Sequence, residues 1–235
     1  MSKPGKAKGM TLIELAVVLL ILIALAGMLV PMFSDTGRYA QCVATDNTLV
    51  NLRDAILGSG GQPGYRSDLG KMPDSNLSYL FNQPPATSRF NPATGRGWRG
   101  PYLNGGSTCE SLARALNREG IDTTADAASI LQQACAFSLQ AGSLQPATAN
   151  RVVALDSFQL MGPNGPFPVR SPIRLFRDGA GHHYLVSAGP DGHTLLGNGF
   201  DPVVDKANAS QDLRRDDRVL FLDFYDAWGN AACTE

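Results

Sequence analysis

The chain has 235 residues, which is enough for one globular domain and an additional long element. Its formal net charge is −1, and charged residues make up 17% of it. This balance argues against a nucleic-acid-binding protein, which would carry a basic surface, and against a disordered acidic tail. We therefore expect a folded domain that binds no nucleic acid.

A long apolar run follows a short basic leader at the start of the chain. The leader MSKPGKAKG carries Lys3, Lys6 and Lys8 and no acid, and Glu14 is the single charge between Met10 and Val30. About twenty apolar residues cross a bilayer as one helix, and basic residues before such a helix favour a cytoplasmic N-terminus. The pattern predicts a transmembrane helix with the rest of the chain on the far side.

Three interpretations of this run compete. A secretory signal peptide would be cut after Ala26, because Ala24-Leu25-Ala26 has the small-x-small form of a cleavage site. A plain membrane anchor is the second interpretation. Neither explains Glu14, since an acid within a membrane helix is costly and indicates a functional site.

The third interpretation comes from a resemblance. Gly9 followed by Met10-Thr11-Leu12-Ile13-Glu14 and a long apolar helix resembles the N-terminus of type IV pilins and type II secretion pseudopilins. The resemblance implies that a prepilin peptidase cuts after Gly9 and methylates the new N-terminal Met10. It implies that Glu14 pairs with a neighbouring subunit's N-terminal amine during assembly, and that Pro31 kinks the helix. Met10 departs from the pattern, because the first mature residue is most often Phe.

The helix is expected to continue beyond Pro31. Apolar residues recur there at three- and four-residue spacing, with polar residues between them, which is typical of a helix with one buried face. These residues are Tyr39, Cys42, Val43, Leu49, Val50, Leu52, Ile56 and Leu57. The glycine-rich stretch from Gly58 to Gly64 should end the helix. The sequence thus divides into a leader (1–9), a transmembrane and amphipathic helix (10–57) and a globular head (58–235).

The head is expected to be α+β. Helical patterns cover Asn76 to Phe81, Thr108 to Arg118 and Thr123 to Leu139. Strand patterns follow at 151–160, 173–176, 184–187 and 219–225, separated by turn residues, which favours an antiparallel sheet. The resemblance implies the pilin fold, in which a long hydrophobic helical spine packs on this sheet. Gly95 to Leu103, with Trp98 and Tyr102, is similar to the segment before the sheet of major pseudopilins and predicts an aromatic cluster at the core edge.

Four cysteines, Cys42, Cys109, Cys135 and Cys233, are present without a C-x-x-C pair. Zinc binding and thioredoxin-like chemistry are therefore not indicated. An even number of cysteines beyond the membrane fits disulfides in an oxidising compartment. We predict Cys109–Cys135, because these two lie in one local helical region, together with Cys42–Cys233. Free buried thiols remain the alternative.

An Asp-rich stretch near the C-terminus is a candidate calcium site. Ser187-Ala-Gly-Pro-Asp191-Gly192 resembles a turn that leads, in major pseudopilins, through a calcium-binding loop to an Asp-Asp pair. Here Asp216-Asp217 is that pair, but more than twenty residues intervene. The resemblance implies one Ca²⁺ held by Asp191 with Asp216 or Asp217, since calcium takes carboxylate and carbonyl oxygens. The alternative is that these residues only form turns.

No catalytic motif stands out: the chain has no G-x-S-x-G elbow and no His-Glu-x-x-His. We therefore expect a structural protein and not an enzyme. The resemblance implies a pseudopilus subunit that serves protein secretion, anchored in the inner membrane with a periplasmic head. Its partners would be copies of itself, other pilin-like subunits, the prepilin peptidase, the inner-membrane assembly platform and membrane lipid. Alternatives are a minor or major subunit of a type IV pilus and a membrane-tethered periplasmic enzyme.

Overall fold

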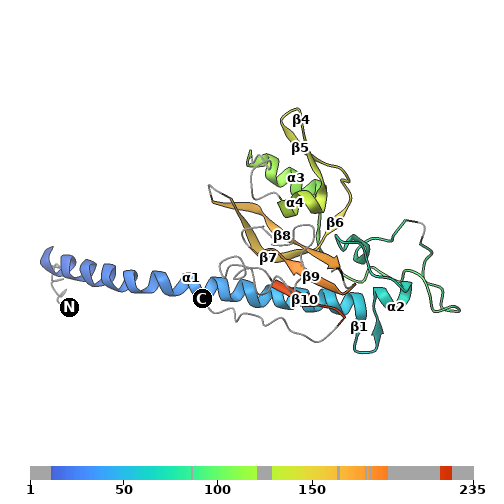
Figure 1. Ribbon diagram of the computed structural model, residues 1–235. Helices are drawn as coiled ribbons and strands as arrows, with labels where there is room; N and C mark the ends of the chain where they lie inside the picture. The colour runs from blue at the N-terminus through green and yellow to red at the C-terminus, as the bar shows by residue number, and fades with distance from the viewer. Residues whose placement is uncertain are drawn as a thin grey trace, which may run out of the picture. The chain divides into compact units, whose positions relative to one another are not determined.

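The computed structural model describes residues 12–85, 87–120, 129–162, 165–177, 179, 181–189 and 218–223 (Figure 1). The chain divides into two compact units, the first ending at Ala40 and the second beginning at Gln41. Helix α1 (Leu12–Leu57) has 46 residues and belongs to both units. It ends where predicted, at Gly58, whose φ of +94° and close approach to Gln62 O favour glycine.

The prediction of a membrane-spanning helix is wrong. Within the described ranges, no helix is both long enough and apolar enough to cross a bilayer. The predicted inner-membrane location, with a cytoplasmic N-terminus and a periplasmic head, is corrected by the same finding.

The predicted fold class is also wrong, because α1 is not a hydrophobic spine along its length. From Gln41 onward the helix is amphipathic: Leu49, Leu52 and Ile56 are buried, and polar residues such as Asn51 are exposed. The second unit is an α+β arrangement in which this amphipathic part of α1 packs on an antiparallel sheet. Among the residues that the structure describes, there is no long apolar helix of the pilin type.

Among the described residues, the sheet has four antiparallel strands in the order β10-β9-β8-β7. These are β7 (Leu155–Gly162), β8 (Gly165–Arg177), β9 (His183–Ser187) and β10 (Arg218–Phe221). The register pairs Gly162 with Gly165 at the β7–β8 turn and aligns Phe176 with Tyr184. Strand β8, with 13 residues, is the longest described strand and pairs with both β7 and β9. It therefore links the two halves of the core.

Two main hydrophobic clusters lie along β8. The first contains Val169 and Leu160 with buried residues of α3 and α4, and the second contains Ile173 and Leu175 with the amphipathic part of α1. Figure 1 shows α3 and α4 at one end of the second unit, and the part of α1 from Gln41 onward along the sheet near β9 and β10. Because both clusters share one strand, substitutions in β8 should affect both.

The remaining elements are short. Beside the end of α1 lie the hairpin β1 (Gly58–Ser59) and β2 (Gln62–Pro63), α2 (Tyr65–Leu69) and a 3₁₀ turn, η1 (Ser78–Leu80). Strand β3 (Ser107–Thr108) pairs with β6 (Val152–Val153) and leads into α3 (Cys109–Arg118). The predicted helix from Thr123 to Leu139 is helical over α4 (Ser129–Cys135), and 121–128 lie outside the described residues.

The end of that predicted helix is wrong. Phe137 to Leu139 belong to β4 (Phe137–Gln140), which pairs with β5 (Ser143–Pro146). Ala136 has a positive φ of 49°, which cannot continue a right-handed helix. The helical spacing of apolar residues continues past Ala136 in the sequence, and no glycine or proline there indicates that the helix ends.

Candidate functional site

The N-terminal segment of α1 is an apolar surface with no described cover. Every side chain from Leu12 to Leu25 is exposed, and Leu12, at 86%, is the most exposed of the large hydrophobic ones. Because a helix turns once every 3.6 residues, a continuous exposed apolar run covers all of its sides. Contiguous apolar surface of this kind indicates a site of interaction with another molecule. We call Leu12–Leu25 the apolar segment.

Glu14 is the one charged residue of the apolar segment and lies in the first turn of α1. The unsatisfied N–H groups and the dipole of a helix N-terminus favour a carboxylate at this position. The cleavage and methylation residues, Gly9 and Met10, lie outside the described residues. Helix α1 continues through Pro31, and the kink expected there stays a prediction.

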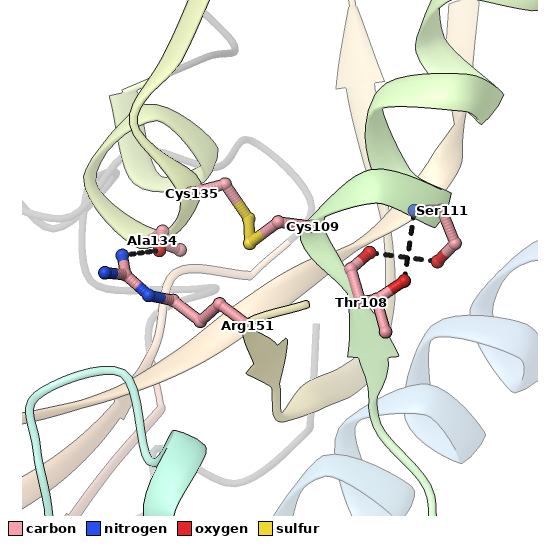
Figure 2. Close-up of a disulfide and its surroundings, with 6 residues drawn as sticks. All are labelled: Thr108, Cys109, Ser111, Ala134, Cys135 and Arg151. Carbon is pink, nitrogen blue, oxygen red and sulfur yellow. Dashed lines mark hydrogen bonds between the residues drawn. A yellow bond between two sulfur atoms is a disulfide. The ribbon is translucent and has the colours of Figure 1, made fainter. Parts of the chain in front are cut away.

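The predicted disulfide between Cys109 and Cys135 is confirmed, with an S–S distance of 2.06 Å (Figure 2). It joins the first residue of α3 to the last residue of α4. The Thr108 hydroxyl accepts a hydrogen bond from Ser111 N at 3.2 Å and caps α3. Arg151 donates to Ala134 O at 3.0 Å beside the bond. The two helices are thus linked both covalently and through Arg151.

Cys42 is also disulfide-bonded. Its predicted partner, Cys233, lies outside the described residues. Among the described cysteines there is no free thiol. The alternative of free buried thiols is therefore wrong for Cys42, Cys109 and Cys135.

The predicted calcium ligands Asp191, Asp216 and Asp217 lie outside the described residues. Within the described ranges, no group of three or more His, Cys, Asp or Glu side chains is arranged to hold a metal ion. The start of the calcium-loop motif is described, at the end of β9. There Ser187 is buried, and its hydroxyl accepts a hydrogen bond from Gly189 N at 3.3 Å. Ser187 therefore fixes the backbone at Gly189 from inside the fold.

Sequence reasoning missed the buried carboxyl group that Ser187 contacts. The Ser187 hydroxyl donates to Asp156 on β7, and Phe158 N donates to the same carboxyl group at 2.8 Å. Burial raises the pKa of Asp156 to about 7, although these two hydrogen bonds act in the opposite direction. The signal in the sequence was a lone acid within the strand pattern from Arg151 to Leu160.

Polar contacts also connect α1 to the sheet. Ser157 N donates to the buried Thr45 hydroxyl at 3.3 Å. Arg218, on the edge strand β10, donates through Nε to Asp46 at 2.9 Å and forms a second bond through its terminal nitrogen. Arg218 is buried, so this bidentate pair fixes the position of β10 against the helix.

His183, one of the chain's three histidines, has a described partner. His193 lies outside the described residues, whereas His183 begins β9 and contacts Asp223 through both its backbone N–H (2.7 Å) and its ring Nδ1 (3.1 Å). Burial raises the pKa of Asp223, but the His183 hydrogen bonds and the charge of Arg66 outweigh it and lower the pKa overall. His183 therefore pairs with Asp223 at the start of β9.

Comparison of the chain with protein-family models, with curated proteins and with solved structures finds no match. Function is therefore inferred from the residues themselves. Of the predicted site residues, Cys109 and Cys135 are brought together, and Glu14 lies within the apolar segment.

Proposed function

We propose that the chain is a structural subunit of a pseudopilus-type or type IV pilus-like filament, serving protein secretion, and that it assembles through the apolar segment of α1. The observation that carries the proposal is the exposure of every side chain from Leu12 to Leu25. A helix that is apolar on all sides needs apolar neighbours on all sides. Copies of the same helix, staggered along a filament axis, would supply them.

The energy available from such packing is large. Burial of apolar surface contributes about 25 cal/mol per Å², so one fully buried leucine contributes roughly 2 kcal/mol. The apolar segment presents many such side chains, among them Leu15, Leu19 and Leu22. Their combined burial would exceed the entropy lost on association, which is roughly 4–15 kcal/mol.

Apolar packing alone does not fix the stagger between neighbours. In the proposed assembly, cleavage after Gly9 leaves an N-terminal amine on Met10, and this amine pairs with Glu14 of a neighbouring subunit. A charge pair within an apolar environment is sensitive to geometry, and removing one partner leaves a buried, uncompensated charge. Glu14 would therefore set the register while the leucines and isoleucines supply the binding energy.

The proposal is tested by placing a charge in the apolar segment. Leu19→Asp should abolish filament formation, because the carboxylate would be buried between helices. Leu139→Asp is the matched control, since Leu139 on β4 is exposed to a similar extent, 53% against 51%, but lies outside the segment. Filaments sheared from cells that produce each variant would be counted by electron microscopy. Normal filaments with Leu19→Asp, or equal loss with both variants, would contradict the proposal.

A further inference from the structure

The loop between η1 and β3 contains a surface pocket that the filament proposal does not use. Its volume is about 410 Å³, and it is lined by Gln83, Arg89, Phe90, Trp98, Arg99 and Gly100. Two guanidinium groups and two aromatic rings thus surround one cavity. This combination offers positive charge together with an apolar wall.

The pocket is built on a fixed backbone. Phe90 N donates to Trp98 O, and Trp98 N donates to Ser88 O, both at 2.9 Å, so the two sides of the loop lie against each other. A Cβ at Gly97 would lie 2.4 Å from Arg89 O, which shows how closely the backbones approach. The Trp98 indole N–H donates to Tyr79 O at 3.1 Å and holds the ring in place.

Arg99 is held in position before any ligand binds. Its guanidinium carbon lies 3.9 Å from the centre of the Phe90 ring, and its terminal nitrogen lies 3.1 Å from Asp68 Oδ1. Asp68 is itself buried (2% exposed) and accepts a second hydrogen bond, at 2.9 Å, from the Tyr102 hydroxyl. A guanidinium carries five N–H donors, so the contact with Asp68 leaves donors for a ligand.

The segment that carries the pocket has an excess of basic residues, although the whole chain has a net charge of −1. Residues 65–100 contain five basic residues, Arg66, Lys71, Arg89, Arg96 and Arg99, and two acidic ones, Asp68 and Asp74. Both acids are used internally, since Asp74 accepts hydrogen bonds from the Ser78 hydroxyl and Tyr79 N. In the part of the chain that the structure describes, Lys71, Arg89 and Arg96 form no ion pair, whereas Arg66 pairs with Asp223.

We propose that this pocket binds an acidic peptide segment of a protein partner. Arg89 and Arg99 would bind one side-chain carboxylate of that segment, because the planar guanidinium matches the two oxygens of a carboxylate. Phe90 and Trp98 contact an apolar side chain next to it. An inorganic anion would leave this aromatic wall unused, and a nucleic acid would require a more extended basic face than one loop. The proposal is independent of filament formation.

Calorimetry on the purified full chain in mild detergent tests it. The probe is an acetylated, amidated peptide of alternating glutamate and phenylalanine, and the same peptide with glutamine in place of glutamate is the uncharged control. We expect the acidic peptide to bind and the glutamine peptide not to bind. Inorganic phosphate should bind far more weakly than the acidic peptide, because it cannot contact Phe90 and Trp98.

A matched pair of variants locates the site. Arg89→Gln removes a guanidinium from the pocket and should weaken peptide binding at least tenfold. Arg96→Gln removes the same charge from the same loop but not from the pocket lining, and should change the affinity less than twofold. Absence of acidic-peptide binding, equal weakening by both variants, or phosphate binding as tight as that of the peptide would overturn the proposal.

Discussion

Asp156 places a titratable group inside the fold, where water does not reach it. Its side chain is on β7, is 1% exposed and contacts the buried Ser187 on β9. Burial raises its pKa to about 7, so it binds a proton in the folded protein under conditions in which an unfolded chain would release it. Stability should therefore depend on pH through this one carboxyl group.

The sign follows from the two pKa values. The unfolded carboxyl group titrates near 3.8 and the folded one near 7, so the stability that Asp156 contributes is full below about pH 4 and is lost as the pH rises to about 7. The free energy of unfolding should fall over this range by as much as roughly 1.4 kcal/mol per pH unit. Asp156→Asn should remove most of that slope, measured by urea denaturation. Asp54→Asn, at the surface, should keep it, and an unchanged slope in Asp156→Asn would contradict the assignment.

Glu14 carries a different prediction, about assembly. Glu14→Leu subunits should be excluded from filaments even when wild-type subunits form them, because the proposed N-terminal amine of the neighbour would then be buried without a counter-charge. Glu14→Asp keeps the charge and should retain partial assembly. Incorporation would be measured by tagging the variant and detecting it in sheared filaments. Incorporation of Glu14→Leu at the wild-type level would rule out the register role.

At the residue scale, the sequence singles out a residue that contrasts with its neighbours, and the role of that residue stays a prediction. Glu14 is conspicuous because apolar residues surround it in the sequence. The pairing of Asp46 with Arg218 could not be predicted, because these residues are 172 positions apart and each resembles an ordinary surface charge. The same holds for Thr45, whose hydroxyl is buried only because the sheet covers it.

At the scale of elements, the disulfide connects α3 to α4 across 26 positions of sequence. Closing a loop of this length restricts the unfolded chain and stabilises a protein by roughly 3 kcal/mol. The double variant Cys109→Ser/Cys135→Ser should therefore unfold at a lower urea concentration, by an amount that corresponds to about that energy. Ser138→Ala, on the neighbouring β4, is the control and should leave the midpoint unchanged. An unshifted midpoint in the double variant would show that the bond contributes nothing to stability.

The amphipathic part of α1 gives a second prediction at this scale. Ile56 is fully buried against the sheet, whereas Val50 is exposed on the opposite side of the same helix. Ile56→Ala should lower the free energy of unfolding by about 2–5 kcal/mol, because it removes buried methyl groups and leaves a cavity. Val50→Ala should change it by less than about 0.5 kcal/mol. Equal effects of the two substitutions would contradict the packing described for α1.

The sequence predicted elements correctly where the spacing of apolar residues and the flanking turn residues indicated the same boundary. The helix over Thr108 to Arg118, the end of α1 before Gly58 and the strand at 184–187 were all predicted, although Thr108 is the N-cap of α3 and not its first residue. The β4–β5 hairpin was missed because α4 ends at Ala136, in a left-handed conformation that alanine rarely adopts; the hairpin turn itself is Ala141-Gly142, with a positive φ at both residues. Strand β8 was expected to be short, since its prolines interrupt the strand pattern.

For the whole molecule, the mass of the chain from native cells decides whether the proposed processing occurs. We expect a chain that begins at N-methylated Met10, as the resemblance to prepilins implies. Intact-mass spectrometry and N-terminal sequencing would detect it. A chain beginning at Met1 or Ser2, or just after Ala26, would remove the processing step and with it the proposed Glu14 partner.

The fold class and the location of the whole molecule were the least predictable from the sequence, as the correction of the membrane-spanning helix shows.

The bond between Asp46 and Arg218 also has a consequence for the order of events during synthesis. Arg218 begins the edge strand β10, which pairs with β9, so both the helix contact and the last sheet pairing wait for a residue made 172 positions after Asp46. Contacts between distant parts of a chain form slowly, and incomplete sheets expose an edge that can pair with other chains. A ribosome that stalls before residue 218 would therefore release a product with β9 unpaired on one side. Such truncated chains should be prone to aggregation and proteolysis.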